Sequence, residues 1–203
     1  MAKSSQNDIE LELRAEISNI KFNSLLDKLR QTAKLTSRSK RLSVMFLGEI
    51  NKLNFDIRAR ISSGGKAEIV LKKGDFHAHN RVESSQEINP NQFLGIVKIL
   101  SNFNFQSKVT ERENFVFDLN NNMCLVLVKA NNIFYAEIEK MSSAEELEEN
   151  RKQLIETLSE LGLKPINETQ FNELCNRLTK KSDWIFEGSQ AHFKKLENML
   201  KGY

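Results

Sequence analysis

The sequence predicts an α+β protein in which a β-rich region carries packed helices and the last part of the chain is helical. Several segments alternate apolar and charged residues with a period of two, which is typical of strands. Other segments repeat apolar residues at helical spacing. Two prolines and eight glycines among 203 residues leave little room for linkers. We therefore expect one domain over 1–203, with 1–141 mostly strands and two inserted helices, and 142–203 forming C-terminal helices.

The composition narrows the classes of protein and of partner. Hydrophobic residues make up 39% and charged residues 28% of the chain, as in ordinary soluble proteins. No segment approaches the roughly 20 apolar residues of a membrane span, and the start of the chain lacks the apolar stretch of a signal peptide. Cys124 and Cys175 fit free thiols of the cytoplasm. A net charge of +3, without a basic aromatic stripe, argues against nucleic acid as a partner.

The first strand is predicted at Ile9–Ile17, where every odd position is apolar and every even position is charged. A strand of this pattern places all its charged residues on one face. The ordinary interpretation is a half-buried strand with a solvated outer face. Residues 55–61 and 135–139 repeat the alternation, so that Arg58 and Arg60 share one face, as do Glu137 and Glu139.

The other elements follow from spacing and turn residues. Phe22 to Ala33 has the apolar spacing of a helix, and the basic run 36–41 is expected to form a solvated connecting loop. Ser62 to Lys66 supplies the turn of a hairpin; its Gly-Gly-Lys lacks the earlier glycine and the following hydroxyl of a phosphate-binding loop. Asn89-Pro90 opens a second helix, and further strands are expected up to Met141. Ser143, in a capping box, Asn167 and Ser189 are expected to cap the C-terminal helices.

The charged positions of these strands form a series with a recognisable order. The series is Glu10-x-Glu12-x-Arg14, Arg58-x-Arg60, Lys72, Arg81-x-Glu83, Arg112 and Glu137-x-Glu139. It resembles the CYTH superfamily, the triphosphate tunnel metalloenzymes that include class IV adenylate cyclases and thiamine triphosphatases. The resemblance covers about two-thirds of the chain. Two positions depart from the family pattern: Arg14 stands where the opening signature has lysine, and apolar residues 125–127 stand where many members have an aspartate.

The resemblance implies an eight-stranded antiparallel barrel with a charged tunnel inside and its apolar face beneath the helices. Glu10, Glu12 and Glu139, with Glu137, would hold Mg²⁺ or Mn²⁺, which are hard cations that prefer carboxylate oxygens. The phosphate chain would be bound by Arg14, Arg58, Arg60, Lys72, Arg81 and Arg112. A tunnel glutamate, Glu10 or Glu83, is a candidate general base, and Lys72 would neutralise the leaving oxygen. A homodimer would agree with the family.

The implied activity is metal-dependent hydrolysis of inorganic tripolyphosphate or of an organic triphosphate. Attack by a ribose 3′-hydroxyl in place of water would instead give cyclic AMP from ATP, as in a class IV adenylate cyclase. The missing aspartate also permits a module that binds triphosphate without turnover. If the charged strand faces are ordinary solvent faces, the domain would bind a protein partner instead.

Overall fold

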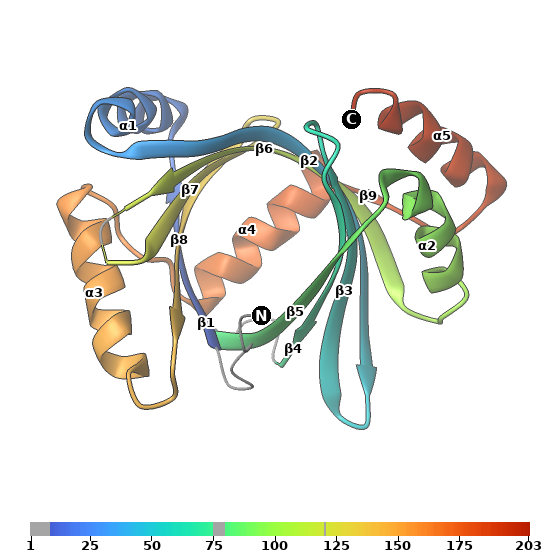
Figure 1. Ribbon diagram of the computed structural model, residues 1–203, viewed down its shortest axis with the longest axis horizontal. Coiled ribbons are helices and arrows are strands. Elements are labelled where there is room, and N and C mark those ends of the chain that lie inside the picture. Colours follow the sequence, from blue (N-terminus) through green and yellow to red (C-terminus); the bar gives the residue numbers. More distant parts are fainter. Residues whose placement is uncertain (1–8, 75–79, 120) are drawn as a thin grey trace.

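A computed structural model describes residues 9–74, 80–119 and 121–203 of the chain. Its strands form one antiparallel sheet that curls strongly around a central space (Figure 1). The eight main strands are β1 (Ile9–Ile17), β2 (Lys34–Ile50), β3 (Leu53–Ser62), β4 (Ala67–Lys73), β5 (Asn80–Ile88), β6 (Gln106–Asp118), β7 (Met123–Ala130) and β8 (Ile133–Ser142). The predicted α+β class and antiparallel eight-stranded sheet are confirmed.

The order of the strands in the sheet is β2-β3-β4-β5-β1-β8-β7-β6, and β2 also pairs with β6. This last pairing joins the two ends of the order, so each of the eight strands has a neighbour on both sides. A ninth strand of two residues, β9 (Trp184–Ile185), pairs with β6 beyond the end of its pairing with β7. Because strand side chains alternate between faces, every second residue of each main strand points into the lumen.

Five α-helices accompany the sheet. They are α1 (Asn19–Thr32), α2 (Phe93–Leu100), α3 (Leu147–Glu160), α4 (Glu168–Lys181) and α5 (Gln190–Leu200), with a short 3-10 turn η1 (Pro90–Gln92) before α2. The predicted caps are confirmed at Asn89, Asn167 and Ser189, whose side chains accept backbone N–H groups. The predicted start at Ser143 is wrong, because Ser143 and Glu146 close a separate turn and α3 begins at Leu147. Among these described helices, none combines the length and apolar content that crossing a bilayer demands.

Two apolar clusters cover the outer face of the sheet. In one, α1 and α3 pack on odd positions of β1, β6 and β7 and even positions of β8, including Leu13 and Phe117. In the other, α2 and α5 pack on β2, β3 and β6 around Phe46 and Phe93. The apolar faces that the alternation predicted therefore lie outward beneath helices, and the charged faces lie inward.

Helix α4 occupies the concave side of the sheet, as Figure 1 shows. Leu174 and Leu178 pack against Val126, Val128 and Tyr135, which belong to the lumen face of β7 and β8. This explains why β7 is continuously apolar, since a strand that is covered on both faces has no need of polar alternation. One part of the lumen is thus filled by apolar packing, and the charged part is what remains.

The expectation of a loop at 36–41 is wrong. Residues 34–50 form the long strand β2, which pairs with β6 from Lys34 onward through an irregularity between Leu35 and Ser37. The run contains serine, threonine and basic residues, so its composition suggested a loop. Pairing with β6 over thirteen positions overrides that local preference.

Gly48 on β2 is expected to tolerate no side chain. A Cβ atom at this position would overlap the ring of Phe105. We expect Gly48→Ala to lower the free energy of unfolding by about 1–3 kcal/mol, because the ring must shift out of a packed site. Urea unfolding measures the change.

Gly64→Ala is the matched control, because nothing lies within 4 Å of the corresponding Cβ position. Equal stability of the two variants would show that the close contact between β2 and Phe105 is not maintained in solution.

Candidate metal and phosphate site

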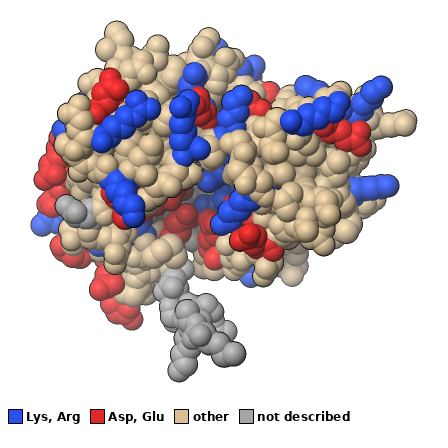
Figure 2. Space-filling view, turned by 45° about the horizontal axis from the view of Figure 1, so that its top comes forward, with Lys and Arg blue, Asp and Glu red and all other residues tan. Residues whose placement is uncertain are grey.

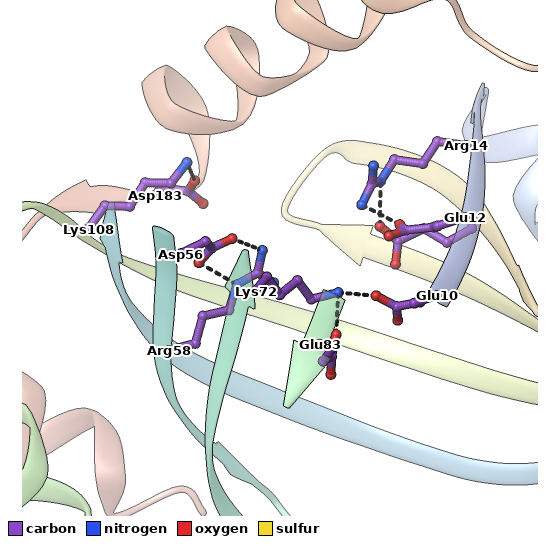
Figure 3. Close-up of polar contacts among 10 residues, drawn as sticks. Glu10, Glu12, Arg14, Asp56, Arg58, Lys72, Glu83, Lys108 and Asp183 are labelled. Atoms are coloured by element: carbon purple, nitrogen blue, oxygen red, sulfur yellow. Dashed lines mark hydrogen bonds and ion pairs between the residues drawn. The ribbon is translucent and has the colours of Figure 1, made fainter. Parts of the chain in front are cut away.

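Strands β1 and β8 bring four predicted glutamates and one arginine to the same wall of the lumen. Their antiparallel register places Glu12 opposite Glu139 and Arg14 opposite Glu137. Figure 3 shows Glu10, Glu12 and Arg14 projecting from β1 toward the basic residues of β3 and β4. The alternating segments at the two ends of the β-rich region therefore meet at one place.

Glu10, Glu12 and Glu139 form a tight carboxylate group. Each offers an oxygen within 4.8 Å of an oxygen of the others, and in the described ranges this is the one such group of three metal-ligating side chains. Glu137 lies outside it, because its carboxylate accepts a hydrogen bond of 2.8 Å from Arg14 Nε. Arg14 also forms an ion pair with Glu12.

The pKa values reflect this crowding of negative charge. Burial raises the pKa of Glu12 to about 7, partly offset by Arg14. Burial, together with the like charges of Glu12 and Glu137, raises the pKa of Glu139 to about 8. Glu137 behaves in the opposite way: burial opposes ionisation, but Arg14 overcomes it and lowers the pKa of this carboxyl to about 2.

The carboxylate group fits a hard divalent cation. Three oxygens from separate side chains converge, and without a cation their mutual repulsion and burial favour protonation of two of them. Carboxylate oxygens are the ligands that Mg²⁺ and Mn²⁺ prefer, and a bound cation would reverse the unfavourable electrostatics. Residues Glu10, Glu12 and Glu139 are therefore suited to hold one such ion.

These pKa values predict how the stability of the metal-free protein changes with pH. A carboxyl whose pKa is raised on folding binds more protons in the folded state, so its stabilising contribution is complete below its usual pKa near 4.5 and is lost as pH rises through about 7 for Glu12 and about 8 for Glu139. We expect the free energy of unfolding in EDTA to fall between about pH 5.5 and about pH 8.5. Urea unfolding at both pH values measures it.

Glu139→Gln should weaken this pH dependence, because the variant lacks the carboxyl with the higher of the two raised values. Glu137 contributes nothing to the slope in this range, since its pKa lies far below it. A metal-free protein whose stability stays constant or rises between these two pH values would contradict the account of the carboxylate group.

Lys72 connects the metal wall to the next strands. Its side chain is buried, and Nζ lies 2.6 Å from Glu10 Oε2 and 2.6 Å from Glu83 Oε2. Figure 3 shows it reaching from β4 between these two carboxylates. Lys72 lowers the pKa of Glu83 against the opposing effect of burial. Both candidate general bases are thus held by one ammonium group.

Arginine side chains line the facing wall. On β3, Arg58 binds Asp56 with both ends of its guanidinium group, at 2.9 Å and 2.5 Å. Arg60, two residues on, has its Nη1 3.5 Å from Glu68, while its buried Nε has no hydrogen-bond partner. The guanidinium of Arg60 is therefore the less completely satisfied of the two.

Arg112 on β6 lies beside a carboxylate that the sequence did not reveal. Asp183, whose side chain is fully buried, lies 2.7 Å from Arg112 and 3.0 Å from Lys108. Lys108 lies on the same face of β6 as Arg112. The strand period of two could therefore have identified Lys108 as a lumen residue from the sequence. Asp183 follows α4 in an irregular segment, and no pattern in the sequence placed it near β6.

Two cavities in the lumen share part of their lining. A cavity of about 210 Å³ is lined by the glutamates of β1 and β8, by Lys72 and by arginines. A second, of about 150 Å³, is bordered by arginines on one side and by Phe171, Leu174 and Cys175 of α4 on the other. The same four arginines, Arg14, Arg41, Arg58 and Arg60, line both cavities. Apart from Arg81, whose side chain lies outside the described part, the predicted phosphate-binding residues all lie around this space or within contact of its lining.

Comparison with known proteins depends on structure, since no family model and no curated protein matches the sequence. The PH1012 protein of Pyrococcus horikoshii OT3 superposes with a TM-score of 0.61 at 21% identity, over 76% of this chain and 91% of that one. A putative adenylate cyclase of Vibrio parahaemolyticus gives 0.63 at 12% identity, over 84% and 99%. A putative adenylyl cyclase of Hippeastrum, described as revealing a dominant triphosphatase activity, gives 0.50 at 15% identity, over 83% and 95%.

The chain has the fold of these proteins. The curled antiparallel sheet that the resemblance to the CYTH superfamily implied is therefore confirmed at the level of fold. At these identities the likeness concerns the course of the backbone, and the activity described for the Hippeastrum protein is that protein's own.

Proposed function

We propose that the chain is a member of the CYTH superfamily that hydrolyses tripolyphosphate or an organic triphosphate with the help of Mg²⁺ or Mn²⁺. One observation carries the proposal: a convergent carboxylate group faces several arginines across a lumen. A solvated strand face would not bury Glu12, Arg60 and Lys72. Buried charges of both signs around open space suit a ligand that carries negative charge together with a cation.

In this proposal the arginines and Lys72 bind and orient the phosphate chain. Guanidinium groups donate paired hydrogen bonds to phosphate oxygens, and such charge-assisted bonds strengthen where water is scarce. Arg14, Arg58, Arg60 and Arg112, with Arg81, are the proposed binding set, and the described members project from three strands, β1, β3 and β6. A chain held from several sides has its phosphorus atoms fixed relative to an attacking water.

Glu10, Glu12 and Glu139, with Glu137 beside them, would hold the cation. When bound, the cation would offset negative charge on phosphate oxygens. Lys72 lies against Glu10 and would donate a proton or a hydrogen bond to the leaving phosphate oxygen. The lowered pKa of Glu83 makes this carboxylate a weak acceptor of a proton from water.

A phosphate-release assay on the purified protein tests the proposal. Tripolyphosphate, ATP and thiamine triphosphate are each supplied with Mg²⁺ or Mn²⁺, and both orthophosphate and cyclic AMP are measured. We expect orthophosphate from at least one of these triphosphates, and none in EDTA.

Cyclic AMP from ATP would select the cyclase instead, an activity that the name of the Vibrio protein makes worth measuring. Binding of tripolyphosphate without any product would select a binding module, in keeping with apolar Val126 on the lumen face where the family pattern has an aspartate. A protein that neither binds tripolyphosphate nor releases any product would refute the proposal.

A further inference from the structure

The basic run of β2 divides between the two faces of the strand. Arg38 is largely exposed on the outer side, where it pairs with Glu113 and lies over the ring of Phe115. Lys40 is also exposed. Arg41 points the other way and lines both cavities of the lumen. One of the three cations that looked solvated in the sequence is therefore inside.

Arg41 differs from the other basic residues of the lumen in its partners. Among the lumen residues whose side chains the structure describes, each of the others lies within 4 Å of at least one carboxylate: Arg14 with Glu12 and Glu137, Arg58 with Asp56, Arg60 with Glu68, Lys72 with Glu10 and Glu83, and Lys108 and Arg112 with Asp183. Within residues 9–74, 80–119 and 121–203, Arg41 has no ion pair and no side-chain hydrogen bond.

The residues opposite Arg41 on the paired strands supply no compensating negative charge. Across the β2–β6 register it lies opposite Arg112, and across the β2–β3 register it lies opposite Ser62. Arg60 is close enough that the charge of Arg41, after burial and Arg58, helps to lower the pKa of Arg60. The buried Nε of Arg60 lacks an acceptor. Two guanidinium groups with spare donors thus border the same open space.

This arrangement is unfavourable for the protein alone and favourable with an anion. Like charges at short range raise the free energy of the folded state, and a buried donor without an acceptor adds to the cost. On the face of the molecule seen in Figure 2, Lys and Arg are spread out with Asp and Glu among them.

We propose that Arg41 is a phosphate-binding residue of the lumen and that, with Arg60, it binds one phosphate group of the substrate. The inference rests on the proposed function and adds a residue to its binding set. A planar guanidinium suits this task because it presents paired donors to two phosphate oxygens, whereas lysine acts as a point charge.

Tripolyphosphate binding in metal-free buffer with EDTA tests the inference, with Kd measured by calorimetry. Arg41→Gln is expected to weaken binding about 10- to 100-fold, the usual effect of losing a charge-assisted contact. Arg41→Lys should fall between Arg41→Gln and wild type. Arg38→Gln is the matched control, since it removes the same charge from the outer face of the same strand and should leave Kd unchanged.

The unfolding midpoint of the variant gives a second readout, because the loss of a residue with a structural role would lower it. Because Arg41 has no partner in the described chain, Arg41→Gln should leave the unfolding midpoint unchanged or raise it, while affinity falls. Equal Kd values for Arg41→Gln, Arg38→Gln and wild type would overturn the inference and leave the proposed function standing. A loss of stability in Arg41→Gln without a change in Kd would overturn it too. A wild-type protein that neither binds nor hydrolyses tripolyphosphate would instead refute the proposed function itself.

Discussion

Glu10→Gln is expected to lower metal-dependent hydrolysis of tripolyphosphate at least about 100-fold. The substitution keeps the shape of the side chain and removes one negative charge from the group formed with Glu12 and Glu139. It also removes a carboxylate that accepts a hydrogen bond of 2.6 Å from Lys72. Orthophosphate release at saturating tripolyphosphate, over a range of Mn²⁺ concentrations, measures both the loss of rate and the loss of metal affinity.

Glu16→Gln is the matched control for this prediction. Glu16 lies on the same strand and in the same alternation, but it is exposed and pairs with Arg177 on α4. Its charge is therefore expected to contribute little to turnover. If Glu10→Gln and Glu16→Gln show the same activity as wild type, the carboxylate group is not the metal site.

Asp183→Asn is expected to lower the free energy of unfolding by about 3 kcal/mol, because it leaves two cations without their carboxylate. The side chain of Asp183 is fully buried between Lys108 and Arg112, and α4 is joined to β6 through this contact. Removal of one member of a buried ion pair is costly because the remaining charge stays desolvated. Urea unfolding of the variant and of wild type measures the difference.

Glu113→Gln provides the comparison at the surface. Glu113 pairs with Arg38, whose side chain is 60% exposed, and solvent screening limits such pairs to under about 1 kcal/mol. Similar losses in Asp183→Asn and Glu113→Gln would mean that the Asp183 contact contributes no more than a surface pair. Added tripolyphosphate should restore part of the stability of Asp183→Asn if Lys108 and Arg112 can bind phosphate.

Local patterns predicted much of the fold. The period-two segments at Ile9–Ile17 and 55–61 became β1 and β3 with their apolar residues outward, because alternation directly fixes which residues share a face. Caps at Asn167 and Ser189 predicted two helix starts, because a polar side chain there satisfies free backbone N–H groups. Which face was inside did not follow from the alternation. The inward position of the charged face was predicted from the resemblance, which depends on the order of the charged motifs along several strands.

Apart from the local turn at Ser143, the errors and omissions have a common physical cause, which is long-range pairing and packing. Residues 36–41 looked like a loop because the stabilising partner, β6, lies some seventy residues further along the chain. Helix α4 showed an apolar face in the sequence, but nothing local indicated that this face would meet Val126 and Val128 inside the curled sheet. The packing of α4 places Asp183, and the pairing of β2 with β6 places Arg41. The sequence could therefore identify the charged series without showing that these two residues belong to it.

The most direct test of the central claim is a crystal structure of the protein soaked with Mn²⁺ and tripolyphosphate, with Mn²⁺ located by anomalous scattering. The account predicts a manganese peak among the carboxylates of Glu10, Glu12 and Glu139, and phosphate density in the lumen against Arg58, Arg60 and Arg41. Manganese and phosphate bound only on the outer surface, with the lumen holding water alone, would contradict it.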